Sequence, residues 1–197
     1  MLILFDGQDR CMKDTLIEKL RKHLKPPYIQ VLHEGKPPSD VDQFKWAIDH
    51  YSYMLRNARM TTDSEVAIYN RCHLGEVVWG PKYRGYNADF IFDLENHYLS
   101  SMDDAYLILL TDSADRLMAR DDGKSLTKSI TELDDVRREF TNAFDKSCIK
   151  NKMHIRLEEV AFEDVFDVVL NFIARSSVKS TSPSGLVDVG TDEDTRS

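Results

Sequence analysis

The sequence predicts an α/β protein built on a doubly wound, five-stranded parallel sheet. Short apolar segments alternate with segments whose apolar residues recur every three or four positions. One of the short segments, Tyr106–Leu110, is an unbroken apolar run, which is typical of a parallel strand covered on both faces. Regular alternation of strand and helix indicates parallel pairing, because parallel neighbours need a crossover connection.

The expected elements follow one another along most of the chain. Strands are expected at Leu2–Asp6, Tyr28–Leu32, Val66–Tyr69, Tyr106–Leu110 and Met153–Leu157. Helices are expected at Lys13–Leu24, through Val41–Leu55, through Ile91–Tyr98, near Ala114–Met118, through Leu133–Phe144 and at Phe162–Ile173. Pro26 ends the first helix, and Ser129 begins the fifth helix with the spacing of a capping box. We expect residues 73–85, which contain three glycines, to form a loop.

Length and composition indicate one domain followed by a tail. The 197 residues suit a single domain, expected at 1–175, and the polar composition of 176–197 predicts a disordered acidic tail. No apolar run approaches the roughly 20 residues that span a bilayer, and the first residues lack the basic segment of a signal peptide. Cys11, Cys72 and Cys148 show no metal-ligand spacing, so we expect reduced thiols in a cytoplasmic protein.

The charge balance bears on the kind of partner. The formal net charge is −8, from 26 basic and 34 acidic residues. Proteins that bind duplex DNA usually present a basic face, because neutralising phosphates dominates their affinity. The balance therefore weighs against nucleic acid and favours a small nucleotide as the ligand.

Residues 7–15 follow the first expected strand and match the P-loop template G-x(4)-G-K-[ST] with two departures. In that template, backbone N–H groups and a lysine bind the phosphates of a nucleotide. Lys13 is in register, whereas Met12 stands at the second glycine and Asp14 at the hydroxyl that binds magnesium. If position 12 needs a positive φ, we expect the side chain to cost about 1 kcal/mol or more. The alternative is an ordinary strand-turn-helix corner.

The same segment resembles the G-x-D-R-x-G-K-S-T loop of thymidylate kinases, including small phage-encoded members of that group. The resemblance implies a P-loop nucleoside monophosphate kinase fold that binds ATP and Mg²⁺. It implies that the whole loop contacts the nucleotide, namely Gly7, Gln8, Asp9, Arg10, Cys11, Met12, Lys13, Asp14 and Thr15. In this family the aspartate matched by Asp9 contacts the 3′-hydroxyl of the acceptor, and Arg10 and Lys13 match groups that assist phosphoryl transfer. Asp14 is the candidate metal ligand, since a carboxylate oxygen suits Mg²⁺.

Asn70-Arg71, at the end of the third expected strand, is the second indication of a site. Ligands of open α/β sheets bind at the carboxyl ends of the strands, so Arg71 is expected to face the same crevice as the loop. Thymidylate kinases have Asp-Arg here, and their arginine clamps the acceptor phosphate; Asn70 departs from that pattern. The segment 73–85 resembles phage thymidylate-kinase-like proteins, and within it Glu76 is a candidate for the carboxylate that position 70 lacks. The alternatives are a surface arginine and a solvated loop.

Further acceptor contacts follow from a gap-free alignment to the family. Trp46 falls where thymidylate kinases place the aromatic residue that stacks on the base, and His50, one helical turn on, falls where a base-contacting arginine sits. Lys36 loosely matches a phosphate-contacting position. The charged segment at about 116–128 resembles the mobile lid of these kinases, with Arg120 as a catalytic candidate. For Trp46 the alternative is an exposed tryptophan without a role, and for the segment at 116–128 it is a solvated charge run.

The sequence therefore predicts an ATP-dependent kinase that phosphorylates a deoxynucleoside monophosphate, either dTMP or a modified dUMP or dTMP analogue. Two alternatives are a kinase acting on a modified thymine base, such as 5-hydroxymethyluracil, in phage DNA, and a catalytically inactive nucleotide-binding module. The resemblance also implies a homodimer, and the cytoplasmic location expected from the cysteines is the host cytoplasm if the protein is viral.

Overall fold

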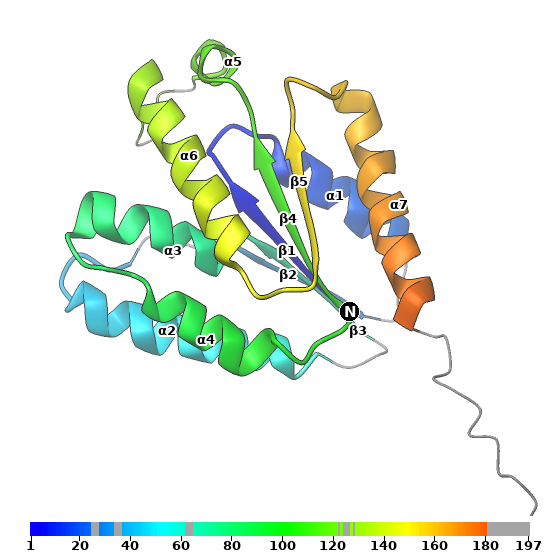
Figure 1. Cartoon of the computed structure of the whole chain (residues 1–197), viewed down its shortest axis with the longest axis horizontal. Helices are drawn as coiled ribbons and strands as arrows, with labels where there is room; N and C mark the ends of the chain where they lie inside the picture. The colour runs from blue at the N-terminus through cyan, green and yellow to red at the C-terminus, as the bar shows by residue number, and fades with distance from the viewer. Residues whose placement is uncertain are drawn as a thin grey trace, which may run out of the picture.

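The computed structural model describes residues 1–24, 28–33, 37–61, 65–121, 123, 127 and 129–180, with the backbone alone at 28–29 and 176–180. Within these residues, five strands form one parallel sheet in the order β2-β3-β1-β4-β5 (Figure 1). The strands are Leu2–Gly7 (β1), Tyr28–His33 (β2), Glu65–Asn70 (β3), Ala105–Thr111 (β4) and Asn151–Arg156 (β5). The predicted fold class is confirmed.

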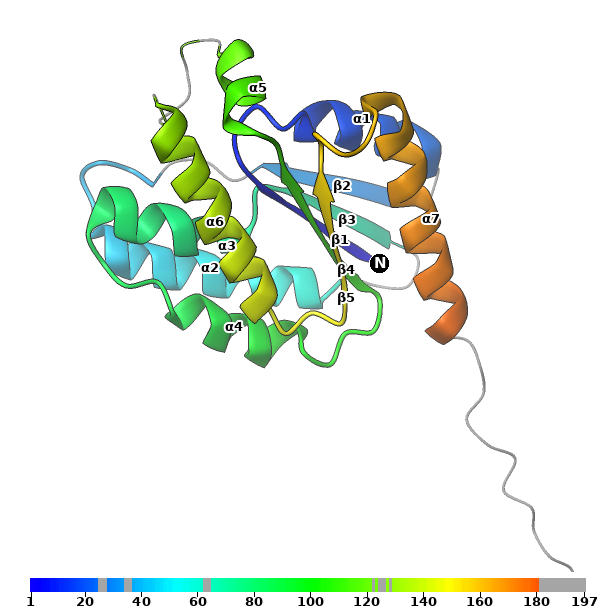
Figure 2. The ribbon, with the colours of Figure 1, turned by 45° about the horizontal axis from the view of Figure 1, so that its top comes forward.

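Helices cover both faces of this sheet (Figures 1 and 2). They are Lys13–Leu24 (α1), Gln43–Arg59 (α2), His73–Trp79 (α3), Phe90–Leu99 (α4), Ala114–Ala119 (α5), Ile130–Lys146 (α6) and Phe162–Ser180 (α7), with a short π-helical turn at Gly80–Arg84 (η1). Helices α2, α3, α4 and most of α6 pack on one face, and α1, α5 and α7 pack on the other. None of the helices within the described ranges is long and apolar enough to span a membrane.

The central strand β1 explains the two-layered core. Its successive side chains point to opposite faces, so Leu2 and Leu4 join the cluster beneath α2 and α4, while Ile3 and Phe5 join the cluster beneath α1 and α7. All four side chains are fully buried. Since every strand runs in the same direction, the carboxyl ends lie together at one edge, beside α5 and the first turns of α1 and α6 (Figure 1).

Side-chain caps begin two of the helices. Asp42 accepts a hydrogen bond from the backbone N–H of Lys45 at 3.1 Å at the start of α2. The predicted cap at Ser129 is confirmed, because its hydroxyl accepts from the N–H of Glu132 at 3.2 Å. Each bond satisfies one of the backbone donors that the first turn of a helix leaves unpaired.

Two expectations about element boundaries were wrong. Residues 73–84 form α3 and η1 instead of a loop, because Gly75 and Gly80 serve close packing: a Cβ at Gly80 would lie 2.9 Å from a carboxylate oxygen of Glu76. Helix α7 continues to Ser180, five residues past the expected end of the domain at 175. Residues 181–197 of the expected tail lie outside the described residues.

Candidate active site

The turn between β1 and α1 has an unusual backbone conformation. Gly7 has a φ of 125°, and a Cβ there would lie 1.9 Å from the carbonyl oxygen of Leu110, so only glycine fits. Arg10 and Met12 also have positive φ values, 66° and 56°. Met12 therefore occupies the left-handed region that favours glycine, as the sequence suggested it would if the loop took the P-loop shape.

Lys13 lies at the base of this turn. Its ammonium nitrogen donates to the carbonyl oxygens of Gly7 at 3.0 Å and Gln8 at 2.5 Å. The side chain is only 2% exposed, and burial lowers the pKa of Lys13 below its ordinary value. The backbone of the loop thus surrounds the Lys13 ammonium. Its two carbonyl oxygens hold this cation at the point where the chain enters α1.

A hollow of about 250 Å³ opens directly in front of this turn. It is lined by Arg10, Cys11, Met12, Lys13, Asp14, Thr15, Arg71 and Arg120. Four of these side chains are cationic, and the hollow lies at the N-terminus of α1, where backbone N–H groups carry partial positive charge. Such an arrangement suits an anion with several oxygens, such as a phosphate chain.

Arg71 reaches the hollow from the end of β3. Its backbone N–H donates to the carbonyl oxygen of Phe5 at 2.9 Å, and its φ of 62° turns the chain sharply out of the sheet. Its guanidinium lies 3.5 Å from a carboxylate oxygen of Asp9 and remains 41% exposed. The structure therefore brings Arg71 and the loop together, as the carboxyl-end argument predicted.

Gln8 connects the loop to the rest of the sheet. Its side chain is fully buried, donates to the carbonyl oxygen of Leu133 at 2.9 Å, and accepts from the N–H of Asp112 at 3.1 Å. These bonds hold the turn against the C-terminal end of β4 and the N-terminal part of α6. The Gln8 side chain thus faces away from the hollow and does not line it, so only its backbone remains a candidate for contact with a nucleotide.

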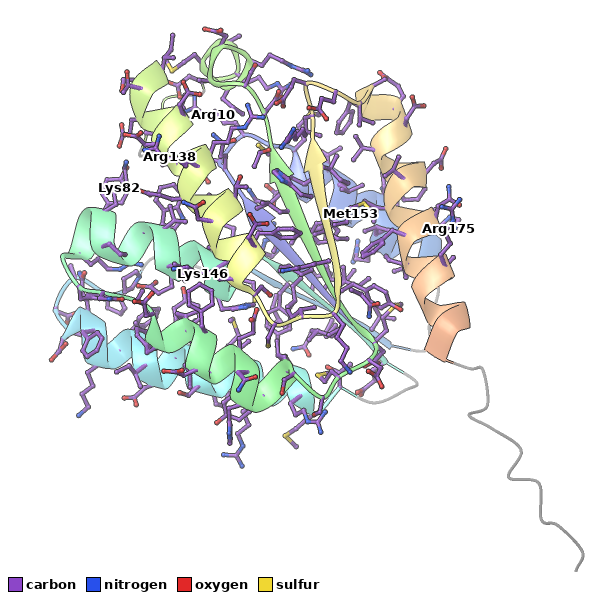
Figure 3. All side chains as sticks on the ribbon, in the orientation of Figure 1. Arg10, Lys82, Arg138, Lys146, Met153 and Arg175 are labelled. Carbon is purple, nitrogen blue, oxygen red and sulfur yellow. The ribbon has the colours of Figure 1, made fainter. Side chains whose placement is uncertain are left out.

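Arg10 joins the loop to the segment expected as a lid. Its guanidinium donates to the carbonyl oxygens of Leu117 at 2.8 Å and Thr127 at 3.2 Å, and pairs with Asp121 at 3.3 Å. Figure 3 shows Arg10 beneath α5 and beside the first turn of α6. In this structure its charge is therefore used largely within the protein.

Arg120 also contacts acidic and backbone groups at the rim of the hollow. It pairs with the buried carboxylate of Asp112 at 2.8 Å and donates to the carbonyl oxygen of Arg10 at 3.3 Å. Arg116, within α5, pairs with the same carboxylate at 3.4 Å. Asp112 therefore binds two arginines, one in α5 and one at the residue that follows this helix. Lys124, which falls within the segment expected as a lid at 116–128, lies outside the described residues.

Asp14, the candidate metal ligand, lies at the edge of the hollow with a 68% exposed side chain. One carboxylate oxygen accepts from the side-chain amide of Asn70 at 2.5 Å, and the same amide nitrogen lies 2.9 Å from Nδ1 of His33. Asn70 is therefore in contact with the loop. It supplies an amide where the resembled family has a carboxylate.

Glu76, the candidate for the missing carboxylate, does not face the hollow. It is buried, pairs with Arg84, and accepts hydrogen bonds from Tyr86 and, at 3.1 Å, from Tyr51. Its charge stabilises the packing of α3 against α2 and η1. The expectation that Glu76 replaces the acid of position 70 was therefore wrong, because α3 directs this side chain into the protein.

Trp46 and His50 lie one turn apart on α2 and stack on each other, with ring centroids 4.4 Å apart and planes 9° from parallel. Both are half-buried, and Trp46 packs against the core beneath α2. Neither is among the residues that line the hollow in front of the loop. Lys36, the other predicted acceptor contact, lies outside the described residues.

Asp6 is a charged residue beside the site that sequence reasoning missed. It is buried behind the loop and accepts hydrogen bonds from the N–H groups of Gly7, Cys72 and Gly75 at 3.2, 3.3 and 3.2 Å. Burial raises the pKa of Asp6 to about 6, and the nearby charges of His73 and Lys13 offset part of that rise. Its position directly before the turn was the only available signal.

A buried pair, His73 and Glu95, lies near Asp6. Nε2 of His73 is 2.7 Å from Glu95, which also accepts from the hydroxyl of Ser147 at 2.7 Å and the N–H of Cys148 at 2.7 Å. Burial opposes ionisation of Glu95, but these donors hold its pKa at about 2. The contacts of His73 with Cys72 and Glu95 raise the His73 pKa well above its ordinary value despite burial.

No family model matches the sequence, and no curated protein matches it. Solved structures do share the fold. YorR from Bacillus subtilis, solved in complex with phosphorylated GDP, superposes with a TM-score of 0.69 at 12% identity over 90% of this chain and 98% of YorR.

Two further structures superpose over most of this chain. Thymidylate kinase from Ehrlichia chaffeensis gives a TM-score of 0.55 at 15% identity over 92% of this chain and 98% of that enzyme. Polyphosphate kinase 2 from Arthrobacter aurescens gives 0.66 at 11% identity over 96% of this chain and 71% of that enzyme. The chain therefore shares its α/β fold, a five-stranded parallel sheet with flanking helices, with these proteins, among them a thymidylate kinase and a polyphosphate kinase.

Proposed function

We propose that this protein is an ATP-dependent P-loop kinase that transfers a phosphoryl group to a deoxynucleoside monophosphate, either dTMP or a modified dUMP or dTMP analogue. The observation that carries the proposal is the hollow in front of the loop, where Lys13, Arg71 and Arg120 converge at the N-terminus of a helix. Phosphoryl transfer needs little from a protein beyond positioning and neutralisation of charge, and these side chains supply both. The thymidylate kinase from Ehrlichia chaffeensis, one of the structures of similar fold, supports the acceptor class.

Lys13 and the loop backbone would bind the phosphates of ATP, including the phosphoryl group that is transferred. The ammonium of Lys13 already sits between the carbonyl oxygens of Gly7 and Gln8. A phosphate oxygen at the base of the hollow would take one of these acceptor places, which exchanges a neutral acceptor for a charged one. Charge-assisted bonds of this kind are roughly twice as strong as neutral ones.

The residues at the edge of the hollow also fit Mg²⁺. Asp14 and Thr15 present a carboxylate and a hydroxyl there, both exposed, and both are hard oxygen ligands. Within the described part of the chain no group of three His, Cys, Asp or Glu side chains could hold a metal by itself. A cation here would therefore take its remaining ligands from phosphate and water, as Mg²⁺ commonly does. When bound, Mg²⁺ neutralises the charge on the β and γ oxygens.

The arginines would act on the acceptor and on the transferred group. Arg71 is 41% exposed, and its guanidinium makes a long contact of 3.5 Å with Asp9, so a phosphate can replace that carboxylate. Asp9 is then available to the acceptor sugar. Arg120 would leave Asp112, and Arg10 would leave its contacts beneath α5, to neutralise charge as the lid segment moves. The stacked rings on α2 are the proposed surface for the base.

One observation favours a second candidate, a nucleotide-binding module without catalysis. Position 70 carries an amide, and that amide already donates to the carboxylate of Asp14. An uncharged group at this point attracts a divalent cation less strongly than a carboxylate does. If this loss is not compensated, the hollow binds nucleotide but transfers nothing.

The test is a phosphoryl-transfer screen of the full chain with labelled ATP and a panel of acceptors: dTMP, dUMP, 5-hydroxymethyl-dUMP, the corresponding nucleosides, and DNA containing 5-hydroxymethyluracil. We expect transfer to a monophosphate, its loss in Lys13→Met, and normal transfer in the control Lys22→Met, whose side chain is 72% exposed on the same helix. Transfer to DNA alone would replace the acceptor class. ATP binding with no transfer to any acceptor would favour the inactive module.

A further inference from the structure

Three polar side chains from three elements meet at the rim of the hollow. His33 and Asn70 end the neighbouring strands β2 and β3 and face each other in the sheet register, and Asp14 lies in the first turn of α1. The Asn70 amide nitrogen is 2.5 Å from an oxygen of Asp14 and 2.9 Å from Nδ1 of His33. The distance between that oxygen and Nδ1 is 3.8 Å. Parallel pairing of β2 and β3 fixes this meeting point, because both strands end at the same edge.

Asn70 is the central member of this group, and half of its amide is unsatisfied. The residue is fully buried, and its side-chain oxygen has no hydrogen-bond partner among the described residues. A buried polar atom without a partner costs about 1–3 kcal/mol. Its amide nitrogen, in contrast, serves two acceptors at once, the Asp14 carboxylate and the His33 ring.

A half-turn of the Asn70 amide would exchange its nitrogen and oxygen. The oxygen would then lie beside the Asp14 oxygen and the His33 nitrogen, so three electron-pair donors would face one point. Without a cation this arrangement is repulsive; with one, it is a ligand set. Neighbouring ligands of an octahedral ion with bonds of about 2.1 Å lie about 3 Å apart, and the separations of 2.5, 2.9 and 3.8 Å lie on both sides of that value.

We propose that Asp14, Asn70 and His33 form a binding site for a divalent transition-metal ion, with Mn²⁺ as the probe. The ligand chemistry determines the class of ion, because an imidazole nitrogen suits first-row transition metals, whereas Mg²⁺ prefers oxygen alone. The proposal deepens the metal site of the proposed kinase by adding His33 and Asn70 to Asp14, and it assigns a transition-metal ion to that site in place of Mg²⁺. It rests on the proposed function only for the use of the ion, and binding itself can be measured without turnover.

His33 is the residue to perturb, because its side chain is 56% exposed, so we expect its removal to leave the sheet intact. The matched control is His23, an exposed histidine near the far end of α1, in edge contact with Phe166. In the full-length parent protein, substoichiometric Mn²⁺ should broaden the NMR resonances of the His33 ring much more strongly than those of His23, which lies nine residues beyond Asp14 on α1. By electron paramagnetic resonance of free Mn²⁺, His33→Ala should weaken binding by roughly tenfold or more, as loss of a metal-site contact typically does, and His23→Ala should not change it.

Each result supports or overturns the proposal. Equal broadening of both histidines, or an unchanged Mn²⁺ affinity in His33→Ala, would overturn the site. Complete reversal of the broadening by an equal concentration of Mg²⁺ would overturn the preference for a transition metal. The Asp14→Asn variant provides a second route to the same measurement. Mn²⁺ at His33 without phosphoryl transfer would count against the kinase alone, and transfer without Mn²⁺ at His33 would count against this site alone.

Discussion

Replacing Met12 tests whether the loop has the strained backbone that the structure shows. Met12 has a φ of 56°, in a region where a Cβ costs roughly 1–2 kcal/mol and glycine costs nothing. Glycine also loses about 0.5–1 kcal/mol more chain entropy on folding than alanine. At position 12 the first effect is larger, so Met12→Gly should be more stable than Met12→Ala by about 1 kcal/mol. Comparing glycine with alanine removes the packing of the methionine side chain from both sides of the comparison.

The control is Lys19, an exposed residue in the interior of α1. There the order should be reversed, with Lys19→Ala more stable than Lys19→Gly by about 1 kcal/mol, which is the ordinary helix preference. Equilibrium urea unfolding of the four variants measures both differences. If Met12→Ala is as stable as Met12→Gly while the Lys19 pair behaves normally, the loop does not hold position 12 in the left-handed region, and the strain argument is refuted.

Three further predictions concern the buried charges and the base. The pKa of Asp6 is raised from 3.8 to about 6, so between these pH values the folded protein keeps a proton that the unfolded chain releases. The unfolding free energy of the parent protein should therefore fall relative to that of Asp6→Asn by up to about 3 kcal/mol between about pH 4 and pH 6. A difference between the two proteins that stays constant with pH in urea unfolding would contradict this prediction. Glu95→Gln should lower the unfolding free energy by about 3–5 kcal/mol at neutral pH, since it breaks the buried pair with His73. The pKa of Glu95 is about 2 in the folded protein against 4.5 ordinarily, so the stabilisation by the ionised pair is present above about pH 4.5. It should disappear as the pH falls towards 2 in acid titrations followed by circular dichroism. Trp46→Ala should weaken acceptor binding by roughly 1–3 kcal/mol without changing ATP affinity, whereas Tyr53→Ala, at a 68% exposed position on the same helix, should change neither in calorimetry.

The order of the elements could be predicted because it depends on local periodicity. Apolar runs and helical spacing indicated all five strands and six of the helices, and the cap at Ser129 is a contact between residues three apart. The segment 73–85 could not be predicted in the same way. Its glycines look like turn residues along the chain, whereas Gly80 is required by the approach of Glu76 and Tyr86 across α3 and η1.

The candidate site divides in the same manner. Lys13 and Arg71 were found because a loop after a strand and the end of a neighbouring parallel strand must share one edge of the sheet. The contacts of Asp6 with Cys72 and Gly75 and the pairing of His73 with Glu95 were not found, because these contacts join residues 22 to 69 positions apart and appear only when β1, α3 and α4 pack together.

The sequence by itself determined the alternating architecture, the turn after the first strand and the presence of a lysine and an arginine at its mouth, since each depends on short-range pattern and on the common direction of parallel strands. Only the tertiary structure decided how the charges are used. It paired Glu76 with Arg84 inside the protein, enclosed Asp6 behind the loop, and brought His33 to Asn70 and Asp14. The physical reason is that the free energy of a charge depends on its burial and its partners, and both are set by elements that are distant along the chain.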